Sequence, residues 1–405
     1  MVTRRRGRAR GIPGGLDLVR VGLLLAGLLA VATGLLPAAE ARQSLARVAP
    51  LLLFLGSVIV LATLTMHARV FDAVAARLAI VARGDYVALF ALVVVFASAT
   101  TFLLNLDTTA VLLTPVLLAL AVRSGIAALP LSMTTIWLSN TASLLLPVSN
   151  LTNLLAADRV GSAPLDFAAR MWLPQLAVVA ATTAFLWACY WRRGRRGDGR
   201  YRPPAPVRMQ TARERVLFRV SAGACVLFVV AIPVLRERIG YAAAGAALIV
   251  LVAFARLDPG RLRVGLVPWR LLVLVTGLFL VVPALARLGL DEVTAALVGT
   301  SSDAGGVFRA AAVGAGLSNV VNNLPAYVAV EAVVPTGNDE QLFGLLIGTN
   351  VGPLVTPWAS LATLLCLESC RAHGLRVDVR RFALHGLGLA VVSVVVGVGA
   401  LLLTA

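Results

Sequence analysis

A chain of 405 residues that is 59% hydrophobic and 14% charged is too apolar for a soluble domain, in which roughly 25% of residues carry charge. The formal net charge of +17 raises the alternative of a nucleic-acid-binding protein. The basic residues, however, are all arginines spread among the loops between apolar segments. The composition therefore predicts an all-α polytopic membrane protein and excludes nucleic acid as its partner.

Apolar segments near the length of about 20 residues that crosses a bilayer recur along the chain. A basic N-terminus, residues 1–15, precedes an apolar run too long for a secretory signal, so we expect an uncleaved first helix. About nine full crossings are predicted, over residues 16–36, 46–66, 131–157, 168–191, 215–234, 239–256, 269–288, 340–370 and 382–404. Residues 69–84 suit an amphipathic helix at the membrane surface, and residues 289–302 its counterpart on the other face.

Two further regions consist of apolar arms joined by a polar tip. In residues 86–123 the tip is Asn105-Leu-Asp-Thr-Thr109, and in residues 304–334 it is Ser318-Asn-Val-Val-Asn-Asn-Leu-Pro325. We interpret both as re-entrant hairpins, which enter the membrane and leave on the same side. If residues 86–123 were an ordinary crossing, the arginine-rich stretch after residue 191 would lie on the outer face.

Two of the predicted crossings carry the same unusual polar motif. Ser139-Asn140-Thr141 is followed by Pro147, and Thr349-Asn350-Val351 is followed by Pro357, with seven residues from asparagine to proline in both cases. Proline removes a backbone donor and disfavours the helix before it. Unsatisfied polar groups are costly inside a bilayer, so two matching clusters indicate broken helices that hold a solute rather than helix contacts alone.

The distribution of arginine gives the orientation. With the N-terminus in the cytoplasm, 28 of the 36 arginines lie on the inner side, as the positive-inside rule requires. The same layout produces two repeats of opposite orientation, each with a hairpin and a broken helix. The predicted domains are residues 1–15 (cytoplasmic N-terminus), 16–191 (first repeat), 192–214 (basic cytoplasmic linker), 215–238 (connecting helix) and 239–405 (second, inverted repeat).

Asp107 is the carboxylate predicted deepest in the membrane. Such a group can bind and release a proton, which makes Asp107 the candidate proton-coupling residue. It could equally cap the following half-helix through the amides of Thr108 and Thr109, and the two roles can coexist. Aligning Ala110 with Ala326 places Asp107 opposite Asn323 of the second hairpin.

The sequence offers no motif for chemistry on a bound cofactor. The four cysteines, Cys189, Cys225, Cys366 and Cys370, lack zinc or redox spacing, and we expect them to be packing residues. We find no nucleophile–base pair, metal motif or nucleotide-binding loop. We therefore expect no cofactor, no metal and no enzymatic activity.

Three runs carry a family likeness. The run Gly348-Thr-Asn-Val-Gly-Pro-Leu-Val-Thr-Pro-Trp-Ala-Ser-Leu-Ala-Thr-Leu-Leu365 resembles the signature of ArsB-type arsenite permeases. Gly316-Leu-Ser-Asn-Val-Val-Asn-Asn-Leu-Pro325 and Asn105-Leu-Asp-Thr-Thr-Ala-Val-Leu-Leu-Thr-Pro115 resemble the paired hairpins of that family. The wider group is the ion transporter superfamily, which includes citrate and dicarboxylate carriers and sodium/proton antiporters. The resemblance implies inverted repeats and a solute held between the hairpin tips and the broken helices.

The candidate solute-binding residues follow from the polar clusters and this resemblance. They are Asn105, Thr108, Thr109, Ser139, Asn140, Thr141, Ser149, Asn150, Ser318, Asn319, Asn322, Asn323, Thr349, Asn350, Thr356 and Ser360.

The predicted function is export of arsenite or antimonite across the plasma membrane, driven by protons and working by alternating access. Neutral As(OH)3 suits amide and hydroxyl ligands without a deep cationic site. The alternatives are a citrate, dicarboxylate or inorganic anion permease, or a sodium/proton antiporter that uses Asp107 as its ion ligand. The expected partners are the solute and the lipid bilayer, and the sequence leaves open a homodimer and an ATPase subunit.

Overall fold

The computed structural model describes residues 15–192, 199–231 and 239–404, and this part of the chain is helical, without β-strands. The helices up to the basic linker are α1 (Gly15–Ala32), α2 (Ala38–His67), α3 (Val70–Val81), α4 (Tyr86–Leu104), α5 (Leu106–Ser124), α6 (Ala128–Thr141), the short helix η1 (Pro147–Ser149), α7 (Leu151–Val160) and α8 (Pro164–Leu186), which η2 (Trp187–Trp191) extends.

After the linker the helices are α9 (Ala212–Ala231), α10 (Ile239–Leu257), η4 (Pro259–Arg261), η5 (Val264–Leu266), α11 (Trp269–Leu285), η6 (Ala286–Leu290), α12 (Asp291–Val298), α13 (Ala304–Val321), α14 (Asn323–Glu331), α15 (Asp339–Val351), α16 (Leu361–Ala372) and α17 (Val379–Leu402). The two short helices predicted near the membrane surfaces correspond to α3 and α12.

The two predicted hairpins are α4–α5 and α13–α14, and each turns at a single asparagine. Asn105 (φ 103°, ψ 151°) and Asn322 (φ 98°, ψ 152°) both adopt a backbone conformation that is normally restricted to glycine. The side chain of each caps the returning arm, because its Oδ1 accepts the amide two residues later, that of Asp107 or Leu324. Asn105, not Asp107, is thus the cap, and the counterpart of Asp107 in the second hairpin is Leu324, not Asn323.

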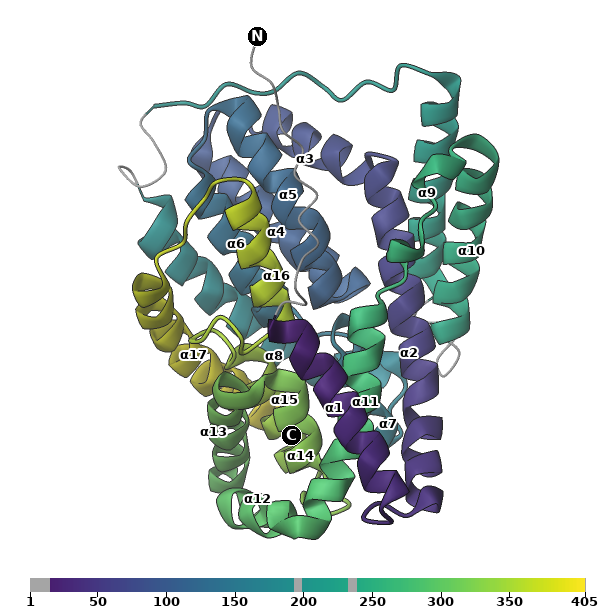
Figure 1. The fold of residues 1–405 in the computed structure, drawn as a ribbon. Helices are drawn as coiled ribbons and strands as arrows, with labels where there is room; N and C mark the ends of the chain where they lie inside the picture. The colour runs from purple at the N-terminus through teal and green to yellow at the C-terminus, as the bar shows by residue number, and fades with distance from the viewer. Residues whose placement is uncertain (1–14, 193–198, 232–238, 405) are drawn as a thin grey trace.

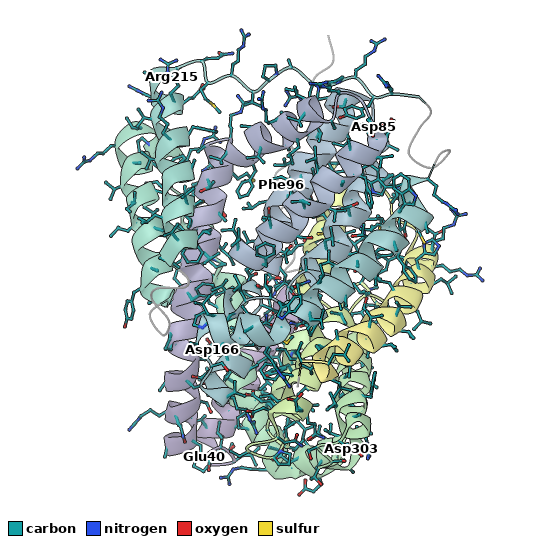
Figure 2. All side chains as sticks on the ribbon, turned by 180° about the vertical axis from the view of Figure 1, so that it is seen from behind. Glu40, Asp85, Phe96, Asp166, Arg215 and Asp303 are labelled. Carbon is teal, nitrogen blue, oxygen red and sulfur yellow. The ribbon has the colours of Figure 1, made fainter. Side chains whose placement is uncertain are left out.

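The hairpins enter from opposite ends of the molecule. Asp85 caps α4 by accepting the amide of Ala88 and lies at the same end as Arg215, whereas Asp303 caps α13 and lies at the end of Glu40 (Figure 2). In Figure 1 residues 199–211 cross the end where α4 starts and α5 finishes, and α12 lies at the other end. We refer to these ends as the linker face and the Glu40 face.

Both predicted broken helices are interrupted. The first consists of α6, a stretch that contains η1, and α7, and the second of α15 and α16, separated by residues 352–360. Eight helical segments of the described residues are long and apolar enough to cross a membrane, and three of them are the hairpin arms α4, α5 and α13. The predicted all-helical fold, with opposed hairpins and broken helices, is confirmed.

The second broken helix packs closely against its hairpin through glycine. A Cβ atom on Gly348 would lie 2.0 Å from the carbonyl oxygen of Ala311, and one on Gly344 would lie 2.7 Å from that of Val307. Small residues at such positions let membrane helices approach backbone to backbone. Gly348 lies within α15, where the absence of a side chain allows this close contact with α13.

Candidate functional site

Side-chain amides hold both breaks open in the same way. In the first, Gln175 of α8 accepts the amides of Leu144 (2.7 Å) and Leu145 (3.1 Å) through Oε1 and donates to the carbonyl of Thr141 (2.9 Å). In the second, Asn319 of α13 accepts the amides of Val355 and Thr356 (both 3.1 Å) and donates to the carbonyl of Gly352 (2.8 Å). Each amide satisfies backbone groups that the interruption leaves without helical partners.

A hydroxyl ties each break to the hairpin of its own half. Ser149 donates to the carbonyl of Phe102 (2.9 Å), and Thr356 donates to the carbonyl of Asn319 (2.9 Å). These carbonyls stand three residues before the tip asparagines Asn105 and Asn322, so the two halves repeat the contact. The hairpin tips and the broken helices are therefore positioned by one another.

The second tip has additional bonds to its break. Asn322 donates through Nδ2 to the carbonyl of Trp358 (2.9 Å), and the amide of Asn323 donates to the carbonyl of Ala359 (2.9 Å). In the first tip, the Nδ2 atom of Asn105 is buried and has no partner among the described residues. The first tip thus keeps hydrogen-bonding capacity that the second has used.

A buried polar network joins the two broken helices. Asn350 of α15 accepts from Nδ2 of Asn150 (2.9 Å) and from Oγ1 of Thr152 (2.7 Å), and it donates to Oδ1 of Asn153 (2.6 Å). All four residues are at most 3% exposed. Asn350 of the second polar motif therefore bonds directly to polar residues that follow Pro147 in the first broken helix.

A second contact across the halves involves Asn140. Its Nδ2 donates to Thr363 of α16 (3.1 Å) and to the carbonyl of Ile136 (3.0 Å), while its Oδ1 has no partner among the described residues. The Oγ atom of Ser360 and the Oγ1 atom of Thr108 are also buried and have no hydrogen-bond partner among the described residues. These buried polar atoms keep hydrogen-bonding capacity that no described residue uses.

Other predicted site residues use their hydroxyls inside their own helices. Each donates to a backbone carbonyl three or four residues earlier, which is the common behaviour of Ser and Thr in helices. They are Thr109, Ser139, Thr141, Ser318 and Thr349. Their place in a solute site stays a prediction.

Three cavities follow one another along α2. Glu40, Ser44 and Arg47 line a cavity of about 430 Å³ at the Glu40 face. Leu55 lines a central cavity of about 30 Å³. Ile59, Ala62 and Thr63 line a third cavity, of about 450 Å³, toward the linker face. Helix α11 gives the same order, because Leu274 lines the central cavity and Phe279, Val282 and Pro283 line the one at the Glu40 face.

The central cavity lies where the two hairpin tips meet the first broken helix. Its polar lining comes from Asp107, Asn150, Asn322 and Asn323, and the rest is leucine. A volume of about 30 Å³ has room for roughly two water molecules. The central and linker-face cavities share Asp107 as well as Leu271 and Leu361, whereas the central and Glu40-face cavities share no lining residue.

Sequence reasoning missed three charged residues in the linker-face cavity. Arg20, Arg270 and Glu368 line it together with Asp107 and Thr108. Arg20 and Arg270 stand near the ends of apolar segments, where the positive-inside rule already accounts for an arginine, and Glu368 lies near the end of the predicted crossing 340–370. Gln175 was missed as well, although it is the one amide in residues 168–191.

The family model for citrate transporters (CitMHS) matches residues 18–363. The chain belongs to the citrate transporter family. An arsenical pump membrane protein of Escherichia coli is 30% identical over 307 residues, which are 69% of each chain. A 46 kDa membrane protein of Mycobacterium leprae is 25% identical over 365 residues, 84% of this chain and 82% of that one. The resemblance to ArsB-type permeases within the ion transporter superfamily is thereby confirmed.

The fold has a counterpart among solved structures. The YdaH transporter of Alcanivorax borkumensis, whose crystal structure is described as having an unusual topology, superposes with a TM-score of 0.59 over 95% of this chain and 97% of that one. At 15% identity the likeness concerns the fold alone. Membership of the citrate transporter family makes the chain a multi-pass membrane transporter for a small molecule or ion.

Proposed function

We propose that this transporter exports trivalent arsenic or antimony hydroxide across the plasma membrane by alternating access, in exchange for protons. The observation that carries the proposal is the central cavity, in which one carboxylate, Asp107, faces neutral amides from both halves. The relative named as an arsenical pump membrane protein supports the choice of solute.

The chemistry of the lining suits a small neutral hydroxide. As(OH)3 offers three O–H donors and oxygen lone pairs, which match the amide groups of Asn150 and Asn323 and the carboxylate of Asp107. The cavity of about 30 Å³ would widen on binding, since hairpin tips of opposite halves form its walls. A cluster of thiolates would hold arsenic tightly and release it slowly, so amide and hydroxyl ligands favour turnover.

The arrangement of the cavities corresponds to one state of an alternating-access cycle. Asp107 borders both the central and the linker-face cavity, so the site is reached from the linker face. The arginine distribution supports a cytoplasmic position for that face, with the N-terminus inside. Asp107 can then take up a solute, or exchange its proton, on the cytoplasmic side.

Transport in everted membrane vesicles tests the proposal. A host that lacks its own arsenite pumps should gain arsenite resistance, and its everted vesicles should accumulate arsenite when the lumen is made acidic. Asp107→Asn should abolish both effects while the protein still inserts, and Asp166→Asn, which changes an exposed carboxylate at the start of α8, should leave both unchanged. Full activity of Asp107→Asn, or absence of arsenite uptake in the unmodified protein, would contradict the proposal.

A second candidate rests on the linker-face cavity. Arg20 and Arg270 line it, and about 450 Å³ is enough for a small carboxylate such as citrate. Sodium-stimulated citrate uptake that is lost in Arg270→Gln would favour an anion permease over the arsenite exporter.

A further inference from the structure

Three charged residues that line the cavity at the Glu40 face, Arg47, Arg159 and Glu331, belong to one cluster. Arg47 of α2 donates to Glu331 of α14 (2.9 Å) and to Asp158 at the end of α7 (3.1 Å). The neighbouring Arg159 donates to the backbone carbonyls of Glu331 and Val334. The first broken helix, the second hairpin and α2 are therefore fastened together at one point.

The two ion pairs of Arg47 differ in their surroundings. The side chain of Glu331 is 3% exposed, whereas that of Asp158 is 58% exposed. Arg47 itself is 38% exposed, so solvent screens part of both pairs, but loss of Arg47 would leave the buried carboxylate of Glu331 without this cation, which costs more than the loss of a pair exposed on both sides. The pair of Arg47 with Glu331 is the one that can hold a conformation.

The position of Glu331 connects this pair to the central cavity. Helix α14 begins at the hairpin tip, and Leu324 on it lines the central cavity, while Val328, one turn later, and Glu331 line the cavity at the Glu40 face. One helical turn thus separates the two cavities along α14. An opening of the central cavity toward the Glu40 face by movement of the end of α14 away from α2 would break this pair.

We propose that Arg47 and Glu331 form the gate that closes the central site on the Glu40 face. This gate rests on the proposed alternating-access function, but not on the identity of the solute. Breaking the pair shifts the population from the state open at the linker face to the state open at the Glu40 face.

Cysteine labelling from each side tests the gate. A reporter, Leu324→Cys, is placed in the central cavity, and a membrane-impermeant maleimide is applied to intact cells or to everted vesicles, with the protein lacking the reporter as background for its four native cysteines. Adding Glu331→Gln or Arg47→Gln should raise the labelling rate from the Glu40 face about tenfold and lower it from the linker face. The reciprocal change distinguishes a shifted equilibrium from local unfolding, which raises labelling from both sides.

Two matched variants serve as controls. Asp158→Asn removes the exposed partner of the same arginine, and Arg287→Gln removes a pair with Glu40 that lies in the same cavity but joins α2 to η6. Both should change labelling less than about threefold, as expected for exposed pairs. Unchanged labelling in Glu331→Gln and Arg47→Gln, or faster labelling from both sides, would overturn the gate.

The outcome is separate from that of the transport assay. A reciprocal shift in a protein that carries no arsenite would refute the proposed solute and leave the gate intact. Arsenite transport without a reciprocal shift in labelling would support the proposed solute and refute the gate.

Discussion

Replacement of Asn350 by alanine should both destabilise the protein and stop transport. Asn350 makes three hydrogen bonds to the other half of the molecule, with Asn150, Thr152 and Asn153, and all four side chains are buried. Alanine leaves each of these partners without its bond to Asn350. Because the same bonds position the two breaks relative to each other, the central cavity loses its alignment as well.

The size of the effect follows from the number of bonds. Hydrogen bonds between helices in membranes average about 0.6 kcal/mol and reach about 1.7 kcal/mol. Three such bonds give a loss of about 2 to 5 kcal/mol, and the upper part of this range is expected because the partners cannot reach water. Asn350→Asp keeps the acceptor for Asn150 and Thr152 but loses the donor to Asn153, so its loss should be intermediate.

The assay is the free energy of unfolding of the purified protein in mixed micelles, measured beside arsenite uptake in everted vesicles. Thr349→Ala is the matched control, because Thr349 is equally buried but directs its hydroxyl to the carbonyls of Leu345 and Leu346 in its own helix. Thr349→Ala should lower the free energy of unfolding by less than about 1 kcal/mol. If Asn350→Ala were as stable as Thr349→Ala and still transported arsenite, the bonds of Asn350 would neither stabilise the protein nor align the two breaks for transport.

Three further predictions concern single residues. Asp107→Asn should retain solute binding although it abolishes proton-driven arsenite uptake, which binding and flux measured at several pH values will show. Gln175→Leu should lower the free energy of unfolding by about 3 kcal/mol, since three buried backbone groups at the first break lose their partner, whereas Gln175→Glu, which keeps the acceptor, should lose less. The amide of Gly306 and the hydroxyl of Ser301 hold the pKa of Asp303 below its ordinary value, so this cap stabilises the protein at neutral pH and its contribution disappears as the pH falls through that lowered pKa. In Asp303→Ala the thermal stability should therefore depend less on pH in the acidic range than in the unmodified protein.

The positions of the hairpins and breaks could be predicted from the sequence because their signals are local. Apolar arms flanking a polar tip gave residues 86–123 and 304–334, and the structure has hairpins over 86–124 and 304–331. Proline and the repeated asparagine marked both breaks. The cost of placing polar groups in lipid makes such features visible in a short window of sequence.

The roles of individual amides could not be predicted in this way. Asn319 belonged to the expected solute ligands, but its Oδ1 accepts two amides of the second break, and its Nδ2 donates to Gly352 in that break and to Ala315 in its own helix. Gln175 performs the same task in the first break from a different kind of element, so no repeat alignment connects the two. A side-chain amide can bond to the backbone of a break, cap a helix or bind a solute, and only its partners in the folded protein show which of these it does.

The sequence by itself determined a helical membrane protein with opposed hairpins and two broken helices, since hydropathy, proline and the bias of arginine act over one segment at a time. Only the tertiary structure decided that Asn150 and Asn350 bond to each other and that Arg47 reaches Glu331. Asn150 and Asn350 stand 200 residues apart, and Arg47 and Glu331 stand 284 apart. Such contacts depend on how the two halves pack together, and packing over that distance leaves no pattern in a single chain.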